Sequence, residues 1–185
     1  MRLNRKFYSR NTKTIAKDLL GKILVNGRCK GKIVETEAYF GATDPASHAF
    51  GKVTKRNILM YQKPGIAYVY FTYGNHWMFN VVTEREGVPS AVLIRALEPL
   101  EGIELMKKRR GKDKLKDLTN GPGKLTQAFG IDKSFDGLDL TKDRLFIEDS
   151  KEKPKIHKTT RIGLSKGQEL LLRFYIKENE FVSRK

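Results

Sequence analysis

Three short apolar segments in the middle of the chain constrain the fold most. Residues 66–72 and 77–83 are rich in aromatic and β-branched side chains, and a tight connection separates them. Glu86-Gly87-Val88-Pro89 then turns the chain before a third apolar segment at 91–97. Strands that follow one another through short turns favour an antiparallel sheet, because parallel strands need long crossover connections.

Turn-forming residues divide the rest of the chain into further short elements. Strands are also predicted at 22–25, 31–39, 144–147 and 169–176, the first two joined by a turn around Asn26-Gly27. Helices are predicted at 12–20, at 99–110 with Pro99 at the start, and at 124–129 ending at Gly130. Segment 41–57 predicts a long irregular loop, and 150–160 a mobile loop. The expected fold is α+β, one domain over residues 1–185.

Positive charge is concentrated at the two ends of the chain. The net charge is +16. Residues 1–32 hold 10 basic and 1 acidic side chains, 33–105 hold 6 and 8, and 106–185 hold 21 and 12. The near-neutral middle is also the most aromatic part. This pattern favours a polyanion partner such as nucleic acid, although a solubilising surface or a lysine-rich thermostable chain remains an alternative.

The low cysteine and histidine content and the lack of a long apolar segment exclude several classes of protein. Cys29 is the single cysteine, which excludes an intramolecular disulfide framework and a multi-cysteine zinc site. The three histidines, His48, His76 and His157, are too few for a histidine-rich metal site, so we expect no metal and no cofactor. Neither a membrane span nor a secretion signal is recognisable, so we expect no membrane partner and a cytoplasmic location.

Two carboxylates lie close together on the strand predicted at 31–39. Alternate residues of a strand share a face, so Glu35, Glu37 and Tyr39 point the same way, with the two carboxylates roughly 7 Å apart. That spacing fits the pair of an inverting glycosidase, but it also fits a solvated strand face. Like charges on one face repel each other, and Arg95 is the candidate cation between them.

Polar and aromatic side chains on the neighbouring segments are further candidates. Asn80 and Arg95 are lone polar residues within apolar strands, so each belongs either to a buried structural network or to a site. Tyr73 is predicted at a hairpin tip, as a contact residue or as a tyrosine that covers the core. Lys124 follows a glycine-rich helix start, Asn120-Gly121-Pro122-Gly123, which suits a DNA phosphate better than a nucleotide because the P-loop spacing is absent.

Taken together and in order, the motifs of residues 5–182 closely resemble those of the alkyladenine (3-methyladenine) DNA glycosylases. The motifs that carry this resemblance are Val34-Glu35-Thr36-Glu37-Ala38-Tyr39, Asp44 with His48, Arg56-Asn57, Lys63-Pro64-Gly65, Tyr68-Val69-Tyr70, Tyr73-Gly74, Asn80, Leu93-Ile94-Arg95-Ala96-Leu97-Glu98-Pro99, Gly121-Pro122, Lys124-Leu125 and Lys133-Ser134-Phe135-Asp136.

The resemblance implies a fold, an activity and a set of residue roles. It implies a curved antiparallel sheet with flanking helices and a monofunctional, monomeric enzyme. This enzyme flips a damaged purine out of double-stranded DNA and hydrolyses its N-glycosidic bond. Its implied roles are Glu37 as general base with Arg95 holding the water; Tyr39, His48 and Tyr70 around the base; Asn80 against the guanine amino group; Tyr73 as wedge; and Lys124 at the DNA backbone.

The same resemblance gives Glu35 a supporting role and leaves two departures and two rival functions. Asn75 and His76 stand where the family pattern has larger apolar or aromatic residues. One rival is a non-catalytic DNA-binding module, for which the charge and aromatic content suffice. The other is a carbohydrate glycosidase that uses Glu35 and Glu37, against which a salt-dependent affinity for duplex DNA would count.

Overall fold

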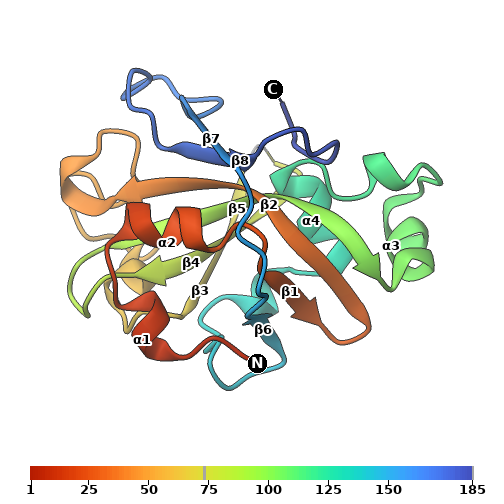
Figure 1. Ribbon diagram of the computed structural model, residues 1–185. Coiled ribbons are helices and arrows are strands. Elements are labelled where there is room, and N and C mark those ends of the chain that lie inside the picture. The colour runs from red at the N-terminus through yellow and green to blue at the C-terminus, as the bar shows by residue number, and fades with distance from the viewer. Residues whose placement is uncertain (73, 185) are drawn as a thin grey trace.

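An antiparallel sheet forms the centre of the computed structural model, which describes residues 1–72 and 74–184 (Figure 1). Within those residues the sheet has eight strands, and six of them follow the order β3-β4-β5-β2-β1-β6. The remaining two form a hairpin, in which β8 pairs with both β2 and β7. The strands are β1 (Ile23–Asn26), β2 (Cys29–Phe40), β3 (Ala67–Thr72), β4 (His76–Thr83), β5 (Ser90–Glu101), β6 (Leu145–Glu148), β7 (Ile156–Thr159) and β8 (Arg173–Ile176).

The sheet is curled, and its two longest strands lie at its centre (Figure 1). Strand β2 pairs with β5 along its whole length, with Glu37 opposite Leu93. The register shifts on both sides of Glu35, as it does in a β-bulge, and bulges bend a strand and increase its twist. Strand β2 also pairs with β1 and β8, so it lies inside the sheet, and residues 33–38 are all buried.

Short helices flank the sheet. The α-helices are α1 (Arg5–Tyr8), α2 (Thr12–Asp18), α3 (Ile103–Arg110) and α4 (Pro122–Phe129), and short 3-10 turns are η1 (Gly41–Thr43), η2 (Ile58–Tyr61), η3 (Leu115–Asp117) and η4 (Lys133–Phe135). Helix α2 lies against one face of β2, where the Thr36 hydroxyl donates to the Ala16 carbonyl oxygen at 2.7 Å. Alternation along the strand therefore places Glu35, Glu37 and Tyr39 on the face turned away from α2.

One apolar core joins the sheet to these helices. Fully buried members come from α2, β2, β4, β5, α4 and β8, among them Ile15, Ile33, Phe79, Ile94, Phe129 and Phe174. Helix α4 is joined to the sheet by the Thr126 hydroxyl, which donates to the Trp77 carbonyl oxygen at 2.9 Å. The result is a single α+β domain with a curved antiparallel sheet, as the sequence predicts.

The predicted helix at 99–110 is wrong in its first turn. Pro99 lies in β5, opposite Gly31, and α3 begins only at Ile103. Pro99 is tolerated in a strand here because the β2–β5 register shifts between Lys30 and Gly31, where the regular ladder is interrupted. Gly102, with φ of 77°, then supplies the left-handed residue that separates the strand from the helix.

Smaller differences concern ends of elements. Helix α2 ends at Asp18 rather than at residue 20, and β8 begins at Arg173 rather than at 169. The predicted loop 150–160 contains a strand, β7, which sequence patterning misses because Ile156 is its single strongly apolar residue. Helix α1 was not predicted. No helix among the described residues is long and apolar enough to cross a membrane.

Candidate active site

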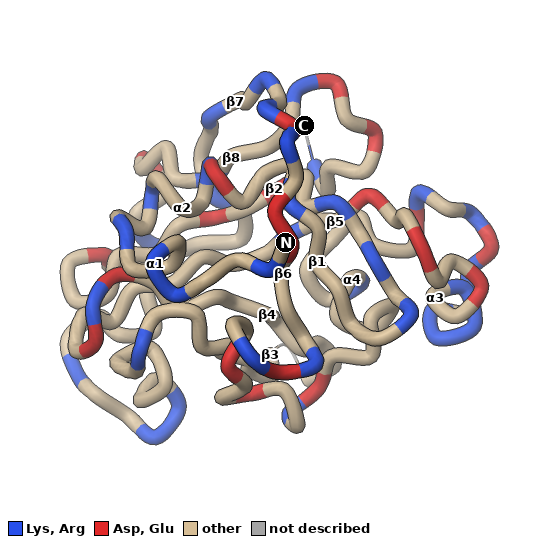
Figure 2. Tube along the Cα trace, turned by 60° about the horizontal axis from the view of Figure 1, so that its bottom comes forward, with Lys and Arg blue, Asp and Glu red and all other residues tan. Residues whose placement is uncertain are grey.

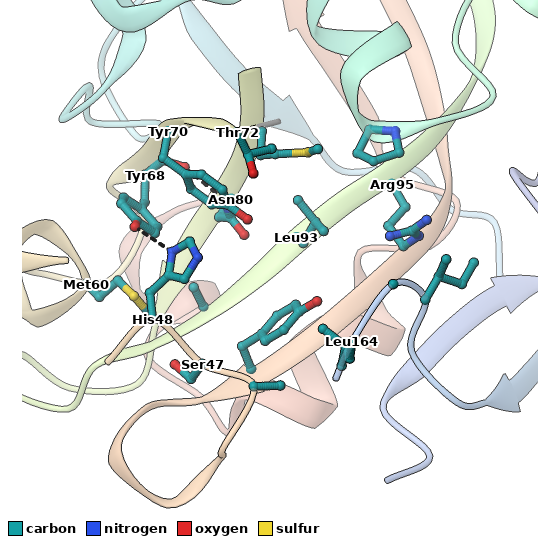
Figure 3. Close-up of a pocket in the computed structure, with 17 residues that line it drawn as sticks. Ser47, His48, Met60, Tyr68, Tyr70, Thr72, Asn80, Leu93, Arg95 and Leu164 are labelled. Carbon is teal, nitrogen blue, oxygen red and sulfur yellow. Dashed lines mark hydrogen bonds between the residues drawn. The ribbon is translucent and has the colours of Figure 1, made fainter. Parts of the chain in front are cut away.

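A cavity of about 270 Å³ opens on the face of β2 that is turned away from α2 (Figure 3). Tyr39, His48, Tyr70, Asn80 and Arg95 all line it, so the structure brings together five of the candidates that lie far apart in the sequence. In Figure 3, His48 and Tyr70 gather on one side and Arg95 lies on the other. The volume is just below the ~300–1,000 Å³ of drug-sized ligand sites, so the cavity suits one small, flat molecule.

Three aromatic side chains in edge-on and tilted contact form one wall. The ring centroids of His48 and Tyr70 are 4.5 Å apart, and those of Tyr68 and Tyr70 are 5.2 Å apart. His48 Nδ1 shares a hydrogen bond with the Tyr68 hydroxyl at 2.9 Å. Desolvation and the nearby Arg56 guanidinium lower the pKa of His48 to about 4, although the residue as a whole is exposed. Histidine 48 is therefore neutral at pH 7 and is a poor source of a proton for catalysis.

Tyr39 and its partners form the opposite wall. The Arg161 guanidinium carbon lies 4.6 Å from the centroid of the Tyr39 ring, which places a cation over one face of that ring. Arg161 is itself held by Asp44, with Nη1 at 2.5 Å from Oδ2 and Nη2 at 2.8 Å from Oδ1. Burial and the adjacent Glu37 carboxylate raise the pKa of Tyr39 well above its usual value. The phenol is thus a fixed hydrogen-bond donor at neutral pH.

Asn80 stands on β4 and is almost wholly buried. Its amide nitrogen donates to the Tyr68 carbonyl oxygen on the neighbouring strand, at 3.1 Å. This bond fixes the orientation of the amide group at the cavity wall. The lone polar residue within an apolar strand therefore combines both readings of the sequence, a satisfied partner in the sheet and a lining residue of the cavity.

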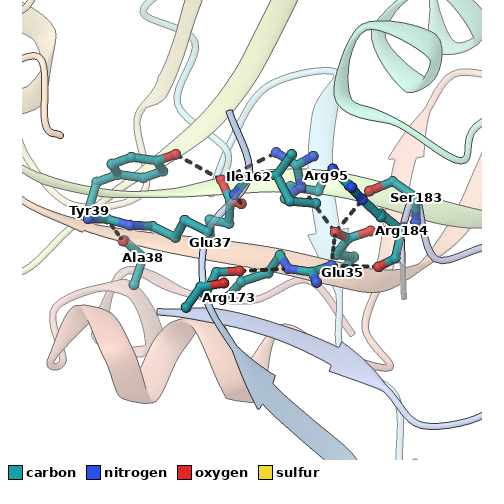
Figure 4. A network of polar contacts seen from close by, with 11 residues as sticks. Glu35, Glu37, Ala38, Tyr39, Arg95, Ile162, Arg173, Ser183 and Arg184 are labelled. Atoms are coloured by element: carbon teal, nitrogen blue, oxygen red, sulfur yellow. Dashed lines mark hydrogen bonds and ion pairs between the residues drawn. The ribbon is translucent and has the colours of Figure 1, made fainter. Parts of the chain in front are cut away.

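Glu37 contacts three residues of the cavity wall, and Figure 4 shows these contacts. Its side chain is fully buried. Oε2 accepts from the Tyr39 hydroxyl at 2.8 Å and from Arg95 Nη1 at 3.3 Å, and Oε1 accepts from the Ile162 backbone N–H at 2.8 Å. All three of these partners line the cavity, so Glu37 is one hydrogen bond away from it. The strand face is not solvated, which excludes that alternative.

Glu35 is also fully buried and holds two cations. Its Oε1 accepts from Arg95 Nε and from Arg173 Nη1, both at 3.0 Å. Arg95 therefore lies between the two carboxylates, as the sequence predicts. Neither carboxylate lines the cavity itself, and of the described partners of Glu35 only Arg95 does. This placement gives Glu35 no access to a ligand in the cavity.

Of the two predicted DNA contacts, Lys124 lies on the helix whose first residue lines the cavity. Pro122, at the start of α4, lines the cavity, and two residues later Lys124 Nζ donates to Asn120 Oδ1 at 2.8 Å. His76 packs against the same helix start, since a β-carbon on Gly123 would come within 2.7 Å of its ring. The predicted wedge, Tyr73, lies outside the described residues.

Sequence reasoning assigned no role to the residues that hold the back of the site, although Asp44 is part of a motif that carries the resemblance. Asp44 and Arg161 form a buried ion pair, and Ile162 supplies a backbone N–H to Glu37. Arg173 had a detectable signal, because it is a lone charge within an apolar segment, as Arg95 is. The backbone donor of Ile162 has no sequence signal at all.

The fold and the site together indicate the class of enzyme to which the protein belongs. An aromatic cavity that is lined by an arginine and backed by a buried carboxylate suits the recognition of a flat ring system and hydrolytic chemistry at its edge. Comparisons with known proteins agree with this class. Residues 6–180 match the family model described as "Methylpurine-DNA glycosylase (MPG)".

Curated relatives cover nearly the whole chain. A protein of Prosthecochloris aestuarii is 51% identical, over 99% of this chain and 91% of its own. Proteins of Clostridium tetani and of Carboxydothermus hydrogenoformans are each 50% identical over the full length of both chains. All three carry the name "Putative 3-methyladenine DNA glycosylase". The chain belongs to the methylpurine-DNA glycosylase family, and it is a DNA glycosylase.

Proposed function

We propose that this protein, acting as a monomer, removes damaged purines from double-stranded DNA. It flips the damaged nucleotide into the cavity and hydrolyses the N-glycosidic bond with a water that Glu37 activates. The observation that carries the proposal is the position of Glu37, a buried carboxylate one hydrogen bond behind a cavity walled by aromatic rings. The family membership supports the same reaction.

The hydrogen bonds of Glu37 indicate where the water binds. A carboxylate offers about four acceptor positions, two on each oxygen. Oε2 accepts from the Tyr39 hydroxyl and from Arg95, whereas among the described residues Oε1 accepts only the Ile162 N–H. The remaining acceptor position is therefore on Oε1, and we assign the water to it, beside Ile162, which lines the cavity. A water there loses a proton to Oε1 as it attacks the sugar carbon.

Arg95 supports this step from β5. Its Nη1 shares Oε2 with the Tyr39 phenol and lines the same cavity, so one guanidinium orients the base and can hold the attacking water. The positive charge also balances the carboxylate in a site that excludes solvent. Hydrogen bonds to ionised groups are about twice as strong as neutral ones, which suits a group that must hold its geometry through the reaction.

Aromatic rings on both sides favour a purine over a sugar chain. Arg161 covers one face of Tyr39, which leaves the other face to stack on the flipped base. His48 and Tyr70 provide the opposing surface. Asn80 lies at the purine 2-position in this pose, where it disfavours the amino group of undamaged guanine. Each stacked base–aromatic contact contributes about 1–3 kcal/mol, which offsets part of the cost of flipping.

The proposed preference for damaged purines follows from the presence of one general base, Glu37. An N-alkylated purine is already cationic and leaves without prior protonation, so one carboxylate that activates water is enough. A neutral lesion such as hypoxanthine needs a proton at the leaving base. Histidine is the side chain whose ordinary pKa suits such a donor, but the lowered pKa of His48 makes it a poor acid at neutral pH. Cationic lesions are therefore expected to react faster than neutral ones.

Charge supports a DNA substrate outside the cavity. Figure 2 shows Lys and Arg on the N-terminal segment, around α3 and around β7, while the central strands are mainly uncharged. Phosphate contacts made by Lys124 and other basic side chains would place the duplex over the rim. Tyr73 follows the cavity-lining Thr72 in the sequence. We assign Tyr73 to the space that the flipped nucleotide leaves in the duplex.

Duplexes that carry one lesion each provide the test. The purified protein is incubated with DNA containing 3-methyladenine, 7-methylguanine, hypoxanthine or ethenoadenine, and alkaline strand scission reports base release. Glu37→Gln should lower single-turnover release by at least ~10² and leave lesion binding within a few-fold. Glu98→Gln, which changes a half-buried carboxylate on β5 that pairs with Lys32, is the matched control.

The outcomes separate the alternatives. Release by the wild type and by Glu98→Gln, but not by Glu37→Gln, supports the proposal. Lesion binding without release by any of the three proteins would favour a non-catalytic DNA-binding module. Activity on a carbohydrate glycoside together with affinity for duplex DNA that does not depend on salt would favour the glycosidase that uses both carboxylates.

A further inference from the structure

We propose that Glu35 is a positioning residue for the reaction, that it acts through Arg95, and that the C-terminal segment 181–184 holds it in place. This inference rests on the proposed function, since it concerns how the base Glu37 is oriented and how its charge is balanced. Glu35 does not touch the cavity, so any effect on base release must pass through Arg95.

The contacts of Glu35 fix the plane of the Arg95 guanidinium. Arg95 donates from Nε to Glu35 Oε1 at 3.0 Å and from Nη1 to Glu37 Oε2 at 3.3 Å. Two hydrogen bonds from different nitrogens of one planar group define its orientation. If the bond to Glu35 is lost, the guanidinium can rotate toward Glu37 and pair with it alone, which changes the geometry that Glu37 offers to a water.

Four charges alternate along this network, and they balance. Figure 4 shows Arg95 between Glu37 and Glu35, and Arg173 on the far side of Glu35. Arg173 Nη1 lies 3.0 Å from Glu35 Oε1, and its side chain is almost wholly buried. Two negative and two positive charges sum to zero in a site closed to solvent. Removing one member leaves a net charge beside Glu37, whose sign depends on the member removed.

The C-terminal segment supplies two further hydrogen-bond donors to Glu35. The Ser183 backbone N–H donates to Oε2 at 2.7 Å, and the Ser183 hydroxyl donates to Oε1 at 2.9 Å. Arg173 Nη1 also donates to the Arg184 carbonyl oxygen at 2.7 Å. A buried carboxylate with this many donors is held in one rotamer, which is what a positioning residue requires. Segment 181–184 is thus part of the site although it lies outside the cavity.

Removing a negative or a positive charge from this network should shift the pH dependence of base release in opposite directions. The groups that face Glu37 are Tyr39 on its own strand, Arg95 on β5, and Arg161 with the Ile162 N–H on the segment after β7. Glu35→Gln adds one net positive charge to this environment, and Arg173→Gln adds one net negative charge. The first change favours the ionised form of the base, and the second disfavours it.

The experiment measures single-turnover release of 7-methylguanine from duplex DNA against pH, for the wild type and four variants. Glu35→Gln should lower the maximal rate at least ~10-fold with unchanged lesion affinity, and it should move the ascending limb about one unit toward lower pH. Arg173→Gln should move the limb about one unit toward higher pH. Ser183→Ala, which keeps every charge, should lower thermal stability and leave the limb in place. Glu98→Gln should change neither the maximal rate nor the position of the ascending limb.

A role in folding alone would give a different result. In that case Glu35→Gln and Arg173→Gln would lose activity in proportion to the unfolded fraction and keep the wild-type limb. Limbs that move together, or a Glu35→Gln rate within two-fold of the wild type, would overturn the inference. If Glu35→Gln fails to fold, the shift of Arg173→Gln against the unshifted Ser183→Ala decides the question. Absence of base release by the wild type would refute the proposed function instead.

Discussion

The buried ion pair behind Tyr39 gives the sharpest prediction about stability. Arg161 and Asp44 have side-chain exposures of 0% and 2%, and two hydrogen bonds of 2.5 and 2.8 Å join them. Arg161 also donates to the Ala38 carbonyl oxygen at 3.0 Å. Removing one partner of a buried pair costs about 3–5 kcal/mol, because the other charge is left without compensation.

We expect Arg161→Met to fall near the lower end of that range. Asp44 keeps two backbone donors, from Phe40 at 3.2 Å and from Ala46 at 3.0 Å, which stabilise part of the orphaned charge. A loss of about 3 kcal/mol corresponds to a decrease in Tm of about 6–12 °C for a chain of this size. Urea unfolding at pH 7 measures the free energy, and calorimetry measures the Tm.

Two further variants and the pH dependence test the cause. Lys166→Met, which removes an exposed charge from the same segment, should change stability by less than about 0.5 kcal/mol. Asp44→Asn, added to Arg161→Met, should restore at least ~1 kcal/mol because it removes the orphaned charge. Burial alone would raise the pKa of Asp44, but the hydrogen bonds and charge of Arg161 hold it below its usual value.

That direction fixes the sign of the pH effect. A lowered pKa contributes stability above the unfolded value near 4, and the contribution is lost as the pH falls through the folded value. The difference between the wild type and Arg161→Met should therefore shrink below about pH 4. A loss under ~1 kcal/mol at pH 7, or no recovery in the double variant, would refute the reasoning.

Three further predictions concern other parts of the protein. Because the pKa of His48 is lowered to about 4 from 6.5, the unfolded chain binds a proton between these values and the folded chain does not, so stability should decline as the pH falls from 6.5 to 4; urea unfolding of His48→Gln at pH 7 and 5 should show a smaller decline. Affinity for undamaged duplex should fall linearly in log–log form with salt, by about 0.9 per neutralised phosphate, and a flat titration would place the basic side chains elsewhere. Tyr73→Ser should reduce lesion affinity and the flipped population reported by a fluorescent base, whereas unchanged values would leave Tyr73 without a role in flipping.

The sequence predicted the elements that turn residues delimit. The hairpin at 66–72 and 77–83 differs from β3 and β4 by one residue at each start, because aromatic and β-branched runs on either side of a short connection have few alternative structures. Pro99 misled the same reasoning. The preference of proline for the first turn of a helix is local, whereas the pairing of β5 with β2 is a tertiary effect that overrides it.

The site was predictable where its residues carry a local signal. Glu35 and Glu37 share a strand face, and Arg95 stands out within an apolar segment, so their association could be foreseen. The pairing of Asp44 with Arg161 could not, because 117 residues separate them and each lies in a polar segment typical of a surface loop. The roles of the lining residues stay predictions.

The hydrogen bonds of the two carboxylates come from segments far apart in the sequence, which affects the order in which the site forms during biosynthesis. Glu37 and Glu35 emerge from the ribosome early, but Ile162, Arg173 and Ser183 complete their hydrogen bonds from the last part of the chain. Translation proceeds from the N-terminus at about 5–20 residues per second, so the early strands wait for several seconds with two like charges unpaired by their late partners. A nascent chain can build most of its core and still lack the hydrogen-bond partners that hold the two carboxylates. The network behind the cavity is therefore complete only after residue 183 has been translated.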